Sequence, residues 1–241
     1  MKKNKVIALL TAAGVGSRTH QDIPKQFLHI NNKPLIIYTM EAFQKHPSVD
    51  EIIVVCLDGW HDVLKAYAKQ FNITKLKYVV SGGNNGQESI YNGLAELEKY
   101  CDKDDLVIVH DGNRALVSQE IITDGIVKCQ QFGGSIAAIP CVEAIFKSKD
   151  SIKSNIHIPR EELFRTQTPH TYPLGKLLWA HSEAKKRNIT NTTATCSLMN
   201  ELGEKIYFSK GSDKNLKVTT IDDIEIFNAL LNSELDSTIK R

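Results

Sequence analysis

Short apolar runs alternate with longer segments of helical spacing from the N-terminus to about residue 140 of this chain. Runs with almost no polar residue are typical of strands buried on both faces of a parallel sheet. They predict strands over 6–10, 51–57, 76–80, 106–109 and 136–139. The apolar positions between these runs predict helices over 34–45, 60–71, 87–100 and 118–132. Strands that alternate with helices imply right-handed crossovers, and therefore an α/β fold with a doubly wound, mostly parallel sheet.

The pattern changes after this first part of the chain. Residues 141–168 are polar and alternating with little helical signal, and we expect them to form a protruding β-hairpin arm. Further on, the pattern predicts helices over 173–186, 193–202 and 220–231, a short strand over 205–208 and the end of another strand over 215–219. Because no linker, repeat or low-complexity tract interrupts the sequence, we expect one domain over 1–241, with the arm as an insertion.

A glycine-rich loop follows the first predicted strand. It reads Thr11-Ala12-Ala13-Gly14-Val15-Gly16-Ser17-Arg18, and Lys25 follows after a short gap. Small residues let backbone N–H groups approach a ligand closely, and Arg18 and Lys25 place two cations beside them. This combination suits a polyphosphate, so we predict that the loop binds the triphosphate of a nucleotide.

Two other glycine-rich motifs do not fit this loop. A dinucleotide-binding fingerprint needs a third glycine, where Thr19 stands, and an acid about 20 residues further on, which the segment 34–39 lacks. A P-loop needs Gly-Lys-Ser or Gly-Lys-Thr, which is absent. A plain turn between strand and helix, without a ligand, remains open.

Three loops meet at one edge of the predicted sheet. The Ala12–Arg18 loop, the Gly82–Gly86 turn and the His110–Arg114 turn all follow the carboxyl ends of predicted strands. In open α/β sheets, ligands bind outside the carboxyl ends of the strands. The sequence therefore predicts a binding site at this edge.

The third of these turns carries a lone carboxylate, Asp111. Magnesium is usually held by one or two carboxylates together with phosphate oxygens and water, so Asp111 would suit Mg²⁺ beside a triphosphate. The alternative is that Asp111 only caps the turn. We interpret His110 as a packed or hydrogen-bonded neighbour rather than a base, and Arg114 could either contact a phosphate or hold the turn by a salt bridge.

Composition narrows the class of protein. Of the 241 residues, 41% are hydrophobic and 24% are charged, and the formal net charge is only +2. Nucleic-acid-binding proteins usually present a basic face, so we expect no nucleic-acid partner. An apolar stretch of about 18 residues is absent, so we expect no membrane span. The five cysteines are scattered without a Cys-x-x-Cys pair, which fits reduced thiols in a cytoplasmic protein and gives no zinc signature.

The loop motifs together resemble a known family. Ala12-Ala13-Gly14-x-Gly16-x-Arg18 followed by Pro24-Lys25-Gln26 is similar to the signature of the methylerythritol phosphate cytidylyltransferases. That family also includes the ribitol phosphate cytidylyltransferases of cell-wall and capsule synthesis. The similarity covers nearly the whole chain, and it continues in order through Gly82-Gly83 with Ser89, Val109-His110-Asp111 with Arg114, Gln167-Thr168-Pro169 and Asn215-Leu216-Lys217-Val218-Thr219.

The resemblance implies a nucleotide-diphospho-sugar transferase fold of Rossmann-like type and transfer of CMP from CTP to a small polyol phosphate, with Mg²⁺ as cofactor. It implies that Arg18 and Lys25 stabilise the pentavalent phosphorus and the leaving pyrophosphate, and that Lys217 assists near the α-phosphate. Asp111 would hold Mg²⁺. The implied nucleotide-binding residues are Ala12, Ala13, Gly14, Gly16, Ser17, Gly82, Gly83, Ser89 and Gly112.

The resemblance also implies an acceptor site formed by Arg114, Arg160 and Thr168. Arg160 would bind the acceptor's phosphate from across a homodimer interface, which the 141–168 arm would build. CTP and a polyol phosphate are the implied partners.

The chain departs from the family pattern mostly on the acceptor side. The departures are Gly86 for an arginine, Gly112-Asn113 for an Ala-rich pair, Ala115 for a proline, Glu143-Ala144 for Asp-Thr, and Thr193-Ala194-Thr195 for a Thr-Asp-acid run. We interpret them as a sign of an acceptor other than methylerythritol phosphate, or of a divergent member. Two alternatives stay open: a nucleotidyltransferase for another phosphorylated acceptor or NTP, and a catalytically weak, CTP-binding homologue.

Overall fold

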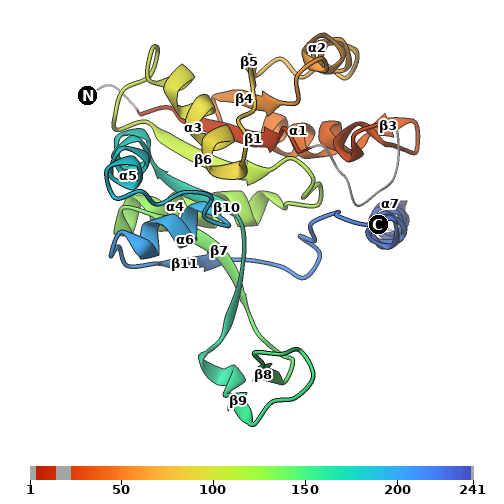
Figure 1. Cartoon of the computed structure of the whole chain (residues 1–241). Helices are drawn as coiled ribbons and strands as arrows, with labels where there is room; N and C mark the ends of the chain where they lie inside the picture. Colours follow the sequence, from red (N-terminus) through yellow and green to blue (C-terminus); the bar gives the residue numbers. More distant parts are fainter. Residues whose placement is uncertain (1–3, 15–22, 240–241) are drawn as a thin grey trace.

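The central sheet carries the fold. The computed structural model describes residues 4–14 and 23–239, and for 234–239 only the backbone (Figure 1). Within these residues one sheet has seven strands in the order β11-β7-β10-β6-β1-β4-β5. The strands are β1 (Val6–Ala12), β4 (Glu51–Cys56), β5 (Leu76–Ser81), β6 (Leu106–Asp111), β7 (Ser135–Pro140), β10 (Phe164–Pro173) and β11 (Phe208–Lys210). All neighbours are parallel except β10, which runs antiparallel to β6 and β7. The predicted mostly parallel α/β sheet is confirmed.

Helices cover both faces of this sheet. They are α1 (Leu35–Lys45), α2 (His61–Gln70), α3 (Gly86–Leu97), α4 (Gln119–Phe132), α5 (Leu174–Lys186), α6 (Thr195–Glu201) and α7 (Ile221–Ile239). Helices α1, α2 and α4 pack with Ala8 and Leu10 of β1, while α3, α5 and α6 pack with Ile7 and Leu9. Side chains alternate between the two faces of a strand, so a strand covered on both faces must be apolar throughout. This is why the first strand reads as a continuous hydrophobic run.

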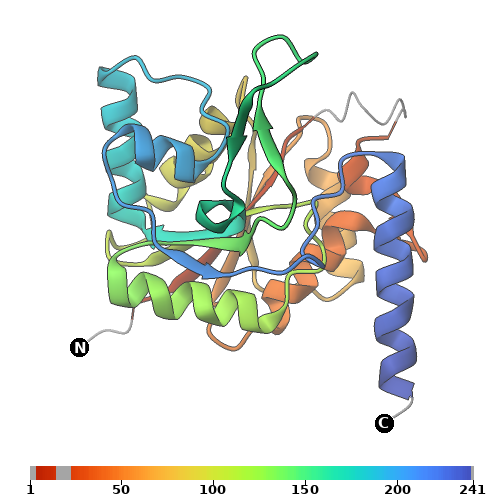
Figure 2. The same cartoon turned by 90° about the horizontal axis from the view of Figure 1, so that it is seen from below.

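Helix α7 stands at the side of the body (Figure 2), and its Phe227 is fully buried edge-on against Tyr38 of α1. Its first turn is capped locally, because Asp223 N–H donates to Thr220 Oγ1 at 3.2 Å and Asp223 Oδ2 accepts from Thr219 and Thr220 N–H groups. Helix α4 begins similarly, with Ser118 Oγ accepting from Ile121 N–H at 3.3 Å. These side-chain acceptors satisfy N–H groups that have no partner inside a helix.

The arm projects away from the sheet (Figure 1). Two short strands, β8 (Ile145–Lys147) and β9 (Ile156–Ile158), pair antiparallel, and the short helical turn η2 (Arg160–Glu162) follows them. A hairpin is thus present where the alternating pattern predicted one. Its dimerising role stays a prediction.

Three details of the sequence prediction are wrong. Residues 164–168 do not belong to the arm, because they begin β10, whose register shifts between Thr166 and His170. The strand expected over 205–208 lies at Phe208–Lys210. No strand forms over 215–219, where side chains of Arg114, Asn113 and Asp223 bond the backbone. A hydropathy pattern finds apolar strands and cannot report a buried strand of polar residues such as Gln167, Thr168 and His170.

Candidate active site

A cleft of about 680 Å³ opens at the carboxyl ends of β1 and β6. It is bounded by the start of α3, by the middle of β10 and by the residues that lead into α6. The predicted site residues in its wall are Ala12, Ala13, Gly14, Lys25, Gly83, Ser89, Asp111, Arg114, Thr168 and Lys217. The structure therefore brings together residues that lie far apart in the chain, from Ala12 to Lys217.

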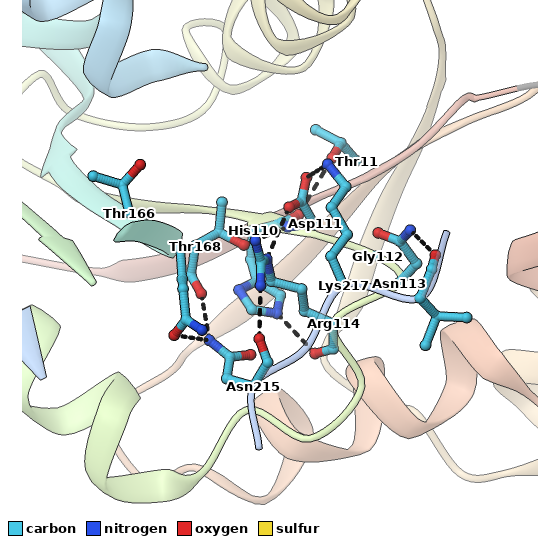
Figure 3. Close-up of polar contacts among 12 residues, drawn as sticks. Thr11, His110, Asp111, Gly112, Asn113, Arg114, Thr166, Thr168, Asn215 and Lys217 are labelled. Atoms are coloured by element: carbon cyan, nitrogen blue, oxygen red, sulfur yellow. Dashed lines mark hydrogen bonds and ion pairs between the residues drawn. The ribbon is translucent and has the colours of Figure 1, made fainter. Parts of the chain in front are cut away.

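Asp111, at the end of β6, is the centre of the polar contacts in this cleft (Figure 3). Its Oδ1 lies 3.1 Å from Lys217 Nζ, and its Oδ2 lies 3.1 Å from Arg114 Nε. Its backbone N–H donates to Thr168 Oγ1 at 3.0 Å. Burial alone would raise the pKa of Asp111, but the cations of Lys217 and Arg114 outweigh burial and lower it to about 2. The carboxylate is therefore ionised at every physiological pH.

Arg114 holds the turn that carries Asp111. Its guanidinium bonds Asp111 Oδ2 on one side and donates from Nη1 to the Asn215 carbonyl at 2.6 Å on the other (Figure 3). Only 13% of its side chain is exposed. Of the two roles left open by the sequence, the salt bridge is the one that the structure shows, and contact with an acceptor phosphate stays a prediction.

Lys217 lies on an irregular segment, 215–218, that is fixed at both ends (Figure 3). At one end, the fully buried Asn215 donates from Nδ2 to the Thr168 carbonyl at 2.8 Å. At the other end, Val218 N–H donates to the Asn113 carbonyl at 3.0 Å, and Asn113 Nδ2 donates to the Val218 carbonyl. Neither asparagine has a predicted role, because nothing in the sequence shows which distant carbonyls they bond.

The glycine-rich loop is tied down by Gln26. This buried side chain donates from Nε2 to the Ala12 carbonyl at 2.7 Å and to the Gly14 carbonyl at 3.2 Å. Lys25 then lies in the cleft wall next to the loop. Gln26 belongs to the Pro24-Lys25-Gln26 motif but received no role from the sequence. Gly16, Ser17 and Arg18 lie outside the described residues, so their predicted roles stay predictions.

Two of the predicted nucleotide-binding glycines lie behind the wall rather than in it. A Cβ on Gly82 would meet Ala13 Cβ at 2.3 Å, and a Cβ on Gly112 would meet the Thr11 carbonyl at 2.9 Å. Gly112 N–H already donates to that Thr11 carbonyl at 2.9 Å. Both glycines therefore let neighbouring loops approach the end of β1. Gly83 does reach the wall, with its N–H donating to Ser89 Oγ at 3.0 Å.

Two histidines lie beside the aspartate. His110 is fully buried with Nε2 3.1 Å from the Arg114 carbonyl, as expected of a packed neighbour. His170, which the sequence analysis missed, is 2% exposed and lies in the cleft wall. Burial lowers the pKa of each to about 4, so both are neutral near pH 7. Neither histidine therefore presents a positive charge to a substrate in the cleft.

The chain matches one protein family over nearly its whole length. The family model of 2-C-methyl-D-erythritol 4-phosphate cytidylyltransferase, IspD, matches residues 6–233. The chain belongs to the IspD family. A ribitol-5-phosphate cytidylyltransferase of Lacticaseibacillus paracasei is 42% identical over 231 residues, which cover 95% of this chain and 99% of that protein. A 2-C-methyl-D-erythritol 4-phosphate cytidylyltransferase of Clostridium botulinum is 37% identical over 232 residues, covering 96% and 98%.

A solved structure shows the same fold. The 4-diphosphocytidyl-2C-methyl-D-erythritol synthase of Anaerococcus prevotii superposes with a TM-score of 0.81 at 22% identity, covering 95% of this chain and 96% of that one. The family model and the 42% identical relative show that the chain is a nucleotidyltransferase of the cytidylyltransferase type. Across the described residues, helices long and apolar enough to cross a membrane are absent.

The second half of the cleft of this IspD-family member is rich in hydroxyl groups. Thr192 and Thr193 line it from the residues before α6, Thr195 lines it from the first residue of α6, and Thr166 and Thr168 line it from β10. The Thr195 hydroxyl is buried without a hydrogen-bond partner in the part of the chain that is described. Among the described lining residues, Asp111 is the only acid. A surface of neutral hydroxyls suits a neutral polyhydroxylated chain, since each hydroxyl can both donate and accept.

Arg160, predicted for the acceptor, is not in this cleft. It lies on the arm, where Nη1 donates to the Val142 carbonyl at 3.0 Å and 58% of its side chain is exposed. Within one chain it therefore cannot serve the site described above. Its predicted role requires a second subunit.

The described residues show which kind of metal site this cleft could provide. They contain no group of three or more His, Cys, Asp or Glu side chains that could hold a metal ion alone. Asp111 has two oxygens with spare acceptor capacity, even with one cation on each. A lone carboxylate fits Mg²⁺ that is shared with phosphate oxygens, and it does not fit a dedicated protein cage.

Proposed function

We propose that this enzyme transfers CMP from CTP to an alditol phosphate, with ribitol 5-phosphate as the acceptor, and releases pyrophosphate. The observation that carries the proposal is the convergence of Lys25, Asp111 and Lys217 on one cleft beside the Ala12–Gly14 loop. A triphosphate needs cations for its oxygens, a carboxylate for its metal ion and backbone groups that approach closely. All three are available around this cleft.

Two observations support ribitol 5-phosphate as the acceptor. The Lacticaseibacillus paracasei relative, at 42% identity, is named a ribitol-5-phosphate cytidylyltransferase. The cleft wall from Thr192 to Thr195 presents hydroxyls and Ala194 rather than carboxylates. A linear polyol offers a row of hydroxyl groups, which such a wall can bond without placing like charges near the acceptor phosphate.

In the proposed reaction, an oxygen of the acceptor phosphate attacks the α-phosphorus of CTP. A new P–O bond forms at that phosphorus, and its bond to the oxygen that bridges to the β-phosphate breaks. The electron pair of the broken bond leaves with pyrophosphate. One phosphoanhydride replaces another, so a covalent enzyme intermediate is not needed, and catalysis rests on positioning and charge stabilisation.

The charged residues divide this work. We assign Lys25, with Arg18, to the negative charge that grows on the leaving pyrophosphate, and Lys217 to the charge around the α-phosphorus. Asp111 would hold Mg²⁺ together with phosphate oxygens. Bound magnesium supplies charge neutralisation on the triphosphate. Gln26 would keep the Ala12–Gly14 carbonyls in place, which orients the loop's N–H groups toward the nucleotide.

We further propose a cytoplasmic homodimer. All five cysteines are free, which fits a reducing compartment. The exposed arm carries apolar side chains, with Val142 65%, Phe146 57% and Ile156 49% exposed in the single chain. Apolar side chains gathered on one projecting element are typical of an interface. In such a dimer Arg160 would bind the acceptor phosphate in the partner's cleft.

Pyrophosphate release tests the proposal. The assay contains CTP, Mg²⁺ and one acceptor from a panel of ribitol 5-phosphate, methylerythritol 4-phosphate, glycerol 3-phosphate and choline phosphate. We expect the highest kcat/KM with ribitol 5-phosphate, and a loss of about 10²-fold or more in Lys25→Ala, because a cation aimed at the transition state is removed. Lys65→Ala, which removes an exposed lysine of α2, is the matched control.

The proposed acceptor is wrong if another member of the panel reacts faster than ribitol 5-phosphate. The proposed reaction is wrong if no acceptor gives turnover while CTP still binds. That second result would favour the CTP-binding homologue.

A further inference from the structure

Lys217 depends on its backbone for its position. Its side chain is 44% exposed, and it contacts Asp111 from the irregular segment 215–218 rather than from a helix or strand. A lysine side chain has many rotamers, and fixing it in one of them costs conformational entropy. The 3.1 Å contact with Asp111 can be kept only if the backbone holds Lys217 within reach.

The residue that fixes the far end of this segment is Asn113. Its carbonyl accepts from Val218 N–H at 3.0 Å, and its Nδ2 donates back to the Val218 carbonyl (Figure 3). Both residues are buried, with 6% of Asn113 and 1% of Val218 exposed. Loss of the carboxamide would leave the Val218 carbonyl without this donor in a place that water does not reach freely.

The same asparagine belongs to the turn that carries Asp111. Only Gly112 separates the two residues, and Arg114 N–H closes the turn onto the Asp111 carbonyl at 3.0 Å. A hydrogen bond from Asn113 to Val218 therefore joins the carboxylate's turn directly to the lysine's segment. The distance between Asp111 and Lys217 is set by this junction.

We infer that Asn113 is a positioning residue for catalysis, whose carboxamide keeps Lys217 in register with Asp111 and with the α-phosphorus of the nucleotide. The inference rests on the proposed function, because it takes Lys217 to act in the transition state. Lys25, the glycine-rich loop and Ser89 contact the cleft independently of Asn113. Loss of the carboxamide therefore lowers kcat and leaves the KM for CTP nearly unchanged.

A double-mutant cycle with Lys217 tests the inference. Asn113→Ala lowers kcat about tenfold, the size expected for one buried hydrogen bond. Asn113→Leu, which fills the same space without a donor, gives the same loss. In a Lys217→Ala background, Asn113→Ala causes no further loss, because the residue acts through that lysine.

Thr39→Val is the control for general loosening of the turn. Thr39 Oγ1 donates to the Gly112 carbonyl at 2.8 Å, so this variant removes a hydrogen bond from the same turn without touching Val218. We expect a small effect on kcat that persists unchanged in the Lys217→Ala background. The inference is overturned if Asn113→Ala leaves kcat intact, or if its full loss also persists without Lys217.

Hydrogen–deuterium exchange gives a readout that needs no turnover. In Asn113→Leu, the peptide that covers 215–219 exchanges several-fold faster than in the wild type, while β1 is unchanged. Unchanged exchange in this peptide shows that the carboxamide does not hold the segment and refutes the inference. Faster exchange in an enzyme that shows no CMP transfer would locate the failure in the proposed function instead.

Discussion

Among single residues, Asp111 obtains its properties from one near and one distant cation in the chain. Its own turn provides Arg114, while Lys217 comes from beyond α6. The two cations keep the carboxylate ionised although it is nearly buried. The histidines around the same cleft are uncharged near pH 7, because burial lowers the pKa of His110, His170 and His181 to about 4 from an ordinary 6.5.

These three histidines predict a loss of stability in mild acid. Between pH 6.5 and 4 the unfolded chain binds protons at these positions and the folded chain does not, so the free energy of unfolding falls as the pH falls. The slope is at most about 1.4 kcal/mol per pH unit for each histidine. We expect urea midpoints to drop from pH 7 to pH 5, with a shallower drop in His181→Gln. A midpoint that is constant over this range would contradict the buried, neutral state.

At the scale of elements, the first turn of α3 connects the two halves of the cleft. Gln87 Oε1 accepts from Thr192 N–H at 2.9 Å and from Thr192 Oγ1–H at 3.0 Å, and Nε2 donates to the Ile189 carbonyl at 3.0 Å. The same turn carries Ser89, whose Oγ accepts from Gly83 N–H on the side of the glycine-rich loop. Gln87 therefore links the hydroxyl-rich wall to the helix turn that packs beside this loop.

We expect Gln87→Ala to loosen only the cleft wall around Thr192, which we propose binds the acceptor. The Thr192 hydroxyl and N–H lose their acceptor, so the wall that leads into α6 is held less firmly, while Gly83 and Ser89 keep their bond. We predict a rise of about five- to tenfold in the KM for the polyol phosphate, with the KM for CTP changed less than twofold. Gln44→Ala is the control, because it removes contacts of an α1 glutamine with Thr74 Oγ1 and Lys75 N–H, and this glutamine does not line the cleft. Equal rises in both KM values would refute this division.

At the scale of the whole molecule, the arm separates Arg160 from the cleft of its own chain. If Arg160 serves the partner's cleft, each complete site contains Lys217 from one subunit and Arg160 from the other. Such a site can be split between two inactive proteins. This gives the homodimer proposal a direct test.

Mixing Arg160→Ala with Lys217→Ala should restore activity. After subunit exchange, one site of each heterodimer has both an intact Lys217 and an intact partner Arg160, so the mixture should exceed either variant alone by at least about tenfold. Size-exclusion chromatography with light scattering should give twice the chain mass, and Phe146→Asp should shift it toward the monomer. A monomeric wild type, or a mixture no more active than its components, would show that the arm does not complete the site.

The features that could be predicted from the sequence are those that a local pattern of residues determines. The buried strand that begins at Val6 and the glycine-rich loop after it have local signatures, and the lone Asp111 at a strand end pointed to the site. Residues whose partners are distant could not be predicted in the same way. Asn113, Gln26 and Asn215 are ordinary polar residues in the sequence, and only the fold shows which carbonyls they reach.

The wrong predictions for β10 and for segment 215–219 also arise from contacts that are distant in the sequence. Most β10 residues over 167–171 are polar, so they carry no apolar strand pattern, although the sheet buries them between β6 and β7. The 215–219 segment has alternating apolar residues at Leu216 and Val218, which resemble a strand end. Its hydrogen bonds go instead to Asn113, Gln167 and Thr168, because the segment crosses the carboxyl ends of the strands rather than joining the sheet.

The fate of labelled phosphorus tests the central claim most directly. CTP carrying ³²P at either the α- or the γ-phosphate is incubated with ribitol 5-phosphate and Mg²⁺, and the products are separated. We expect the α-label in CDP-ribitol and the γ-label in pyrophosphate, at a rate that falls about 10²-fold or more in Lys217→Ala. Label from the γ-phosphate on the acceptor, or wild-type transfer that survives unchanged without Lys217, would contradict it.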